Sequence, residues 1–119
     1  MTSSARAEVA ARSDEGVVLP LRLRRAVGAA ERAIGLLGRA SLAPDEGFVI
    51  GGCGAIHTVG MRFAIDVVFL DAGGRVVRVA ESLPAWRVAW AARATTVLEL
   101  AAGVSAGLGI REGTHLALT

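Results

Sequence analysis

The sequence predicts a β-rich α+β fold, a small twisted sheet or open barrel of about six strands with one short helix packed on one side. Short apolar segments recur along the chain between glycine, proline and aspartate, which is typical of strands joined by turns. One segment, residues 29–39, carries apolar residues at helical spacing. The length of 119 residues matches a single domain.

The globular domain is expected to comprise residues 16–119. Residues 1–15 are mostly small or charged and lack the apolar stretch of a secretory signal, so we expect a disordered tail there. No apolar run is long enough to cross a bilayer. A single cysteine excludes an intramolecular disulfide, and together these features predict a cytoplasmic protein.

The first structured segments are a strand and a helix. In residues 17–25 leucines alternate with arginines, which indicates a strand with one solvent-exposed face. Pro20 lacks an amide hydrogen, so we expect this strand to lie at an edge or to begin there. The helix over residues 29–39 is expected to end at Gly38 in a left-handed cap.

The middle of the chain predicts the core strands. Residues 48–50 form a short apolar strand that leads into a glycine-rich stretch. Residues 65–70 are apolar at every position except Asp66, so both faces of this strand should be buried. The turn residues 71–74 then return the chain as a strand over residues 75–80, which completes a β-hairpin.

The last third is expected to hold two more strands. Residues 82–92 read as a long irregular connection whose tryptophans, Trp86 and Trp90, pack over one end of the barrel. Residues 95–100 form a strand with alternating faces, and a single helical turn follows at residues 106–108. Residues 115–118 form the final strand.

Several spaced motifs resemble a bacterial family known as domain of unknown function 192. Glu31-Arg32 followed by GLLGR at residues 35–39 is similar to its helix signature, and HTVGMRFAIDVVFLD at residues 57–71 to its central one. Shorter matches follow in order: GRVV at 74–77, Trp86-Arg87, VLEL at 97–100 and LGI at 108–110. The resemblance implies a compact β-rich domain and carries over no catalytic residues, because the family has none established.

The chain departs from this family at three positions. Many relatives have Pro where Ala64 stands and Asp where His115 stands, and one branch has Trp at the position of Gly60. A pocket shaped by these positions would therefore differ here.

Composition argues against a nucleic-acid partner. The formal net charge is only +2, and the 13 basic residues are all arginines spread along the chain. A nucleic-acid surface needs basic residues clustered near aromatic ones.

The candidate site is the loop from Gly51 to Asp66, whose glycines allow the backbone to approach a ligand closely. No P-loop or Rossmann fingerprint is present. Asp66 is the key residue, because a carboxylate inside an apolar strand must be paired. We expect Arg62, His57 or the amides of the glycine loop to pair with it. The predicted ligand-binding residues are His57, Arg62, Asp66, Trp86, Arg87 and Arg32.

Three functions remain open at this point. The leading one is a non-catalytic domain that binds a small polar or anionic ligand, or a partner protein, through the Gly51–Asp66 loop. A small hydrolase or transferase would use Cys53 as nucleophile, His57 as base and Asp66 as orienting acid. The third is a structural or scaffolding role, in which an exposed apolar patch supports a stable oligomer.

No metal or cofactor is expected. Cys53, His57, Asp66 and His115 are residue types that bind zinc, but their spacing matches no common zinc signature.

Overall fold

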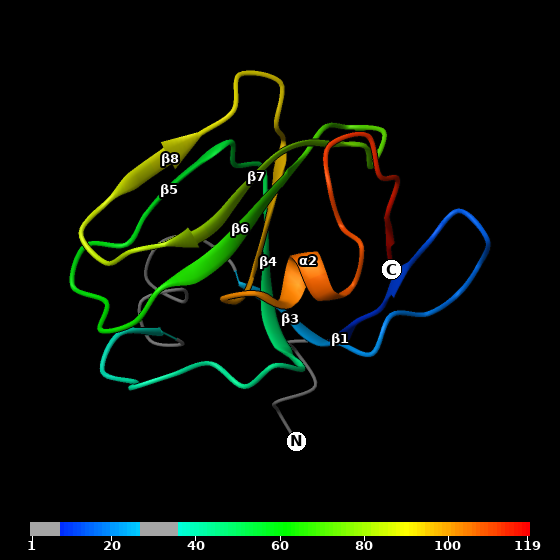
Figure 1. Cartoon of the computed structure of the whole chain (residues 1–119). Coiled ribbons are helices and arrows are strands. Elements are labelled where there is room, and N and C mark those ends of the chain that lie inside the picture. The colour runs from blue at the N-terminus through cyan, green and yellow to red at the C-terminus, as the bar shows by residue number, and fades with distance from the viewer. Residues whose placement is uncertain (1–7, 27–35) are drawn as a thin grey trace.

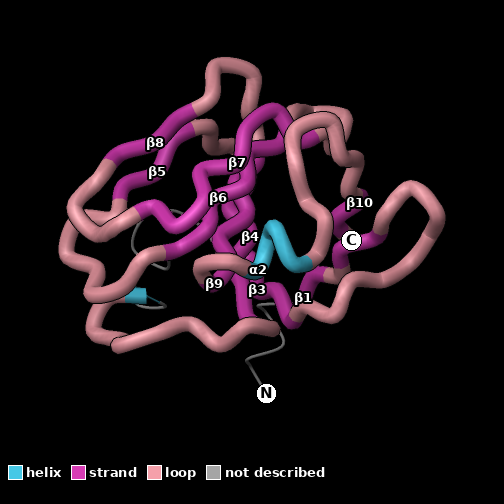
Figure 2. Tube along the Cα trace, viewed as in Figure 1, coloured by secondary structure: helices cyan, strands magenta, loops and turns pink. Residues whose placement is uncertain are grey.

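The computed structural model describes residues 8–26 and 36–119, and its central feature is a mixed six-stranded sheet (Figures 1 and 2). Two small two-stranded sheets and one short helix complete the described part, which confirms the predicted β-rich class. Neighbouring strands of the main sheet are antiparallel except β3 and β4. Its order is β1 (Glu8–Val9), β3 (Arg22–Ala26), β4 (Glu46–Gly51), β9 (Thr96–Ala101), β6 (Ile65–Leu70) and β7 (Val76–Leu83).

The two small sheets cover opposite faces of the main sheet. One pairs β5 (Ala55–His57) with β8 (Val88–Trp90), and its Ile56 and Ala89 join the core cluster that contains Phe69. The other pairs β2 (Ala11–Arg12) with β10 (Ala117–Leu118), and Ala11 joins a second cluster built on Leu98. Helix α2 (Val104–Gly107) lies at the end of β9 and contributes Val104 to both clusters.

Strand β6 is the centre of the fold, and all six of its residues are buried. Val67 and Phe69 face one cluster, whereas Val68 and Leu70 face the other. Because the sheet is covered on both faces, the apolar run of this strand needs no alternation with polar residues. The predicted double burial and the β6–β7 hairpin are both confirmed.

The prediction for residues 82–92 is wrong, because this segment is not an irregular connection. Strand β7 continues to Leu83, and β8 pairs with β5. Trp86 and Trp90 do not pack in the core either, since they are 65% and 63% exposed. In strand β8 the smallest residue, Ala89, points inward, whereas the large apolar residues point outward. This reverses the usual pattern, so hydrophobic periodicity does not predict the strand.

The boundaries near the N-terminus also differ from the expectation. Residues 8–12 lie within the expected disordered tail, but the structure forms β1 and β2 there. Val9 and Ala11 are buried in the core. Strand β3 is not at an edge, because β1 pairs along its outer side. Pro20 precedes the strand and so costs it no ladder hydrogen bond.

The helical segments have two different outcomes. Most of the helix expected over residues 29–39 lies outside the described residues. The single helical turn expected at residues 106–108 is present as α2, two residues earlier. Within the described residues, no helix combines the length and apolarity needed to span a membrane.

Gly47 gives a direct test of the packing between β4 and its neighbours. A Cβ placed there would lie 2.7 Å from Leu23 Cδ2 and 2.8 Å from the Glu99 carbonyl oxygen. We expect Gly47→Ala to lower the free energy of unfolding by about 1–3 kcal/mol through overpacking. Gly51→Ala, in the same strand with no atom within 4 Å of the added Cβ, is the matched control. Equal stability of the two variants in urea denaturation would contradict this packing.

Candidate functional site

Asp66 is fully buried, and its carboxylate is saturated with hydrogen bonds. The amides of Ser82, Gly103 and Ser105 donate to it at 2.8, 3.1 and 2.9 Å, and the Ser105 hydroxyl donates at 2.6 Å. These donors come from the end of β7 and the start of α2. A buried carboxylate needs such donors to offset its lost hydration. The expectation that Asp66 is paired is therefore correct, but its expected partners, Arg62, His57 and the glycine-loop amides, are wrong.

Asp66 also shapes the backbone opposite it in β7. The β6–β7 pairing shifts register between Ile65 and Val67, where Ile65 faces Leu83 and Val67 faces Ala80. Ser82 lies within this bulge with a φ of 49°, a left-handed conformation that non-glycine residues seldom adopt. Its amide donates to the side chain of Asp66 and so remains satisfied despite the bulge.

The other predicted site residues lie apart from Asp66. His57 is at the exposed end of β5, where its Nδ1 accepts a hydrogen bond from the Val59 amide at 3.2 Å. Arg62 is exposed in the turn before β6. Arg32 lies outside the described residues. The structure thus brings neither His57 nor Arg62 to the Asp66 carboxylate.

Cys53 and His57 have different hydrogen-bond partners. The Cys53 thiol donates to the Ala55 carbonyl at 2.8 Å and packs against the core cluster. No hydrogen bond joins the two side chains, and Asp66 bonds elsewhere. The described residues also contain no group of three or more His, Cys, Asp and Glu side chains that could hold a metal ion.

His115 lies in a different part of the fold, next to β10. Its Nδ1 is 2.9 Å from the Asp14 carboxylate, and its Nε2 is 2.6 Å from the Gly73 carbonyl oxygen. His115 therefore ties the N-terminal hairpin to the β6–β7 turn.

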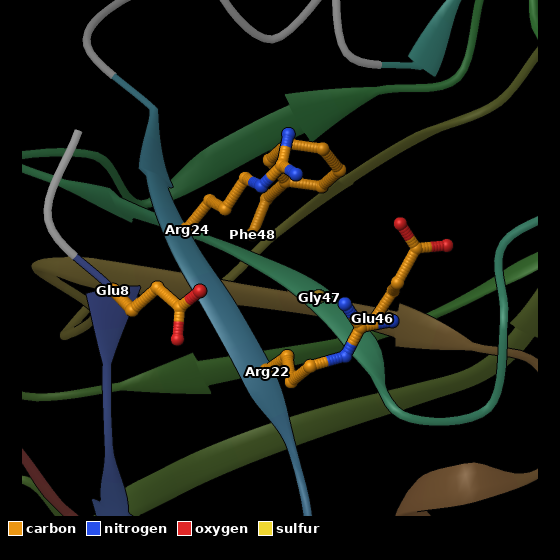
Figure 3. A pocket seen from close by; sticks show the side chains of 6 residues that line it. All are labelled: Glu8, Arg22, Arg24, Glu46, Gly47 and Phe48. Carbon is orange, nitrogen blue, oxygen red and sulfur yellow. The ribbon is translucent and has the colours of Figure 1, made fainter. Parts of the chain in front are cut away.

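Two hollows of the described surface are lined by none of the predicted ligand-binding residues. An open cleft of about 310 Å³ runs between residues 70–74 and residues 115–118. Asp71 lies in the wall of this cleft. Hydrogen bonds from the Arg75 and Gly73 amides hold the pKa of its carboxyl group below the ordinary value. A second hollow of about 20 Å³ has room for about one water molecule (Figure 3). It is lined by Glu8, Arg22, Arg24, Glu46, Gly47 and Phe48.

The most unusual surface is the outer face of the β5–β8 sheet, which we call the tryptophan face. Val88 is 61% exposed between the two exposed tryptophans. Ala55 pairs with Trp90 and His57 with Val88, so these β5 side chains lie on the same outer face. Its members are Ala55, His57, Val88 and Trp90 of the sheet, and we include the exposed Trp86, which lies two residues before β8. The segment predicted as a binding loop and the tryptophan connection are thus joined in one sheet.

Thr58 fixes the position of Trp86. The Thr58 hydroxyl donates to the Pro84 carbonyl at 2.7 Å and accepts from the Arg87 amide at 2.8 Å. The Trp86 amide donates to the Thr58 carbonyl at 2.9 Å. Trp86 has a φ of 66°, so these bonds hold a strained backbone while the indole stays in solvent. Sequence reasoning missed this role of Thr58, although its position in the central signature was visible.

The family model DUF192, described as "Uncharacterized ACR, COG1430", matches residues 9–118. The chain belongs to this family. The match covers both segments of the tryptophan face and the Asp66 strand, and it confirms the resemblance found in the motifs. No curated protein matches this DUF192 chain.

Solved structures share the DUF192 fold. A protein from Sinorhizobium meliloti 1021, described as a "putative transcription regulator", is 24% identical with a TM-score of 0.77, and 92% of this chain and 91% of that chain are covered. A protein of unknown function from Novosphingobium aromaticivorans is 25% identical with a TM-score of 0.75, covering 92% and 83%. A "putative exported protein" from Burkholderia pseudomallei is 20% identical with a TM-score of 0.52, covering 94% and 24%.

We expect Asp66→Asn to lower the free energy of unfolding by about 2–4 kcal/mol, because the amide NH₂ would face backbone donors. Urea denaturation measures this loss. Asp71→Asn is the control, since an asparagine oxygen can accept the same turn amides, and it should lose much less. An Asp66→Asn protein as stable as the parent would show that the carboxylate is not the anchor.

We expect iodoacetamide to label Cys53 no faster than a small free thiol at neutral pH. The thiol is partly buried, donates to a carbonyl and has no hydrogen bond to His57. Mass spectrometry over time gives the rate, and His57→Ala should leave it unchanged. An enhanced rate that depends on His57 would favour the hydrolase or transferase alternative.

Proposed function

We propose that this chain is a non-catalytic recognition domain that binds a partner protein through the tryptophan face. The observation that carries the proposal is the exposed, strained and rigidly held Trp86. A positive φ at a bulky residue costs stability, and the fold retains it without gaining core packing from the indole. Such a feature is expected where a side chain is displayed for contact.

The composition of the face supports a protein partner. Tryptophan and arginine are enriched among residues that dominate protein–protein binding energy. Trp86, Val88 and Trp90 supply apolar contact area, and Arg87 lies between the first two. Two indoles that are more than 60% exposed can lose much apolar surface to a partner.

The tryptophan face is also preformed. Ile56 and Ala89 anchor the two strands in the core from below, and Thr58 fixes the turn beside them. Binding to a preformed surface avoids much of the cost of ordering side chains and loops. The scaffolding alternative uses this same surface, with a second copy of the chain as the partner.

We keep the cytoplasm as the proposed compartment, because a single cysteine suits a reducing environment. The structural relative described as exported is only 20% identical, so it bears on the fold alone.

Trp86→Gly tests the proposal by separating stability from binding. Glycine removes the left-handed strain but adds chain entropy, so the free energy of unfolding should stay within about 1 kcal/mol of the parent. Binding of the partner should be lost. Denaturation measures the first quantity, and photo-cross-linking in cells measures the second.

The cross-linking experiment places benzoylphenylalanine at Val88, with the same residue at exposed Arg111 as the control. We expect an adduct that is specific to Val88 and disappears in the Trp86→Gly background. Adducts that are identical at both positions would contradict the proposal. An adduct of twice the chain mass would favour the scaffolding alternative.

A further inference from the structure

The two segments that carry the tryptophan face contain charged residues of one sign. Residues 51–65 and 84–95 contain Arg62, Arg87 and Arg93, all exposed, and no aspartate or glutamate. Asp66, the next carboxylate in the chain, turns into the core. No described residue forms an ion pair with these three arginines, whereas Arg22 and Arg39 are paired.

Two of the described arginines outside this region have carboxylate partners. Arg22 pairs with Asp45 at 2.8 Å, and its hydrogen bond lowers the pKa of the Asp45 carboxyl. Arg39 pairs with Glu46 at 2.7 Å and likewise lowers the pKa of Glu46. The two segments that carry the tryptophan face thus hold exposed positive charge and no carboxylate, which makes them complementary to an anionic partner.

The outer edge of β8 is open at Val88. The Thr58 amide donates to the Arg87 carbonyl, and the Ala91 amide donates to the Gly54 carbonyl. Hydrogen-bonded pairs alternate along an antiparallel ladder, so the N–H and C=O of Val88 point away from β5. Arg78 donates to the Trp90 carbonyl at 2.6 Å and covers that end of the edge.

We propose that the tryptophan face binds an acidic, extended segment of the partner protein. Apolar side chains of that segment lie against Trp86, Val88 and Trp90, and its carboxylates meet the exposed arginines. Its backbone pairs with Val88, as in other strand additions to an open sheet edge. This inference rests on the proposed function and specifies the chemistry of the partner.

The aliphatic surface favours a protein segment over a nucleic acid. Bases stack on aromatic rings, and Trp86 and Trp90 could serve that purpose. Val88 and Val59, which are 61% and 43% exposed, offer no ring to a base but suit aliphatic side chains. The test therefore includes a nucleic-acid probe as the rival.

The chain provides its own reporter for this surface. Its only two tryptophans are Trp86 and Trp90, and it has no tyrosine. Intrinsic fluorescence of the intact protein thus reports on the tryptophan face alone. The probe is a short soluble peptide that alternates glutamate with valine. The controls are a lysine–valine peptide of equal length and a single-stranded oligothymidine.

We expect the glutamate–valine peptide to shift the emission to shorter wavelength with saturation, and its affinity to fall as salt rises. Arg87→Glu and Arg93→Glu should each weaken binding by about two- to fivefold. Arg111→Glu is the matched control and should change little. The segment that follows α2, which contains Arg111, lies on the opposite side of the view from β5 and β8 (Figure 1).

Three outcomes would overturn the inference: no saturable shift, equal binding of the lysine–valine peptide, or tighter binding of oligothymidine. If one of these outcomes is found together with a specific cross-link at Val88, the proposed function stands. Only the inference that the partner segment is acidic is then rejected. Loss of both the shift and the cross-link would reject both.

Discussion

The carboxylate of Asp66 is the constraint on which the rest of this fold depends. It lies in the central strand of a sheet covered on both faces, where an ionised group is tolerated only with a full set of donors. Those donors tie three elements together: β6 itself, the bulged end of β7 and the start of α2. One side chain thus fixes where two connections leave the sheet.

The effect of this anchor reaches the surface. Ser82 bends the chain at the end of β7, and Pro84 then accepts a hydrogen bond from Thr58. Thr58 in turn holds Arg87 and Trp86. The residue that carries the exposed indole is therefore linked to the buried carboxylate through a short series of hydrogen-bonded residues. This continuity explains how a small domain can present a rigid aromatic surface on a two-stranded sheet.

Sequence patterns predicted the features that depend on neighbours in the chain. The β6–β7 hairpin follows from an apolar run and turn residues 71–74, and the alternating faces of β9 follow from period two. That Asp66 must be paired was also predictable from its apolar surroundings. Its partners were not, because they are mainly backbone amides 16 to 39 residues away, and an amide has no sequence signature.

The exposure of the two tryptophans was not predicted, for a related reason. Burial was the physically reasonable expectation for two tryptophans in a chain with only 4% aromatic residues. The core is instead filled by aliphatic side chains and phenylalanine, and the indoles remain outside. The pairing of β5 with β8, which joins the two predicted binding segments, also depends on contacts between distant residues.

The anchor has a consequence for how the chain matures on the ribosome. Gly103 and Ser105 follow the last core strand, so the carboxylate cannot complete its set of donors until the C-terminal segment has emerged. Until then, closing the sheet over Asp66 would bury a charge with too few donors. The nascent domain should therefore stay open during synthesis and acquire its core, and with it the turn at Thr58, only after residues 103–105 have emerged.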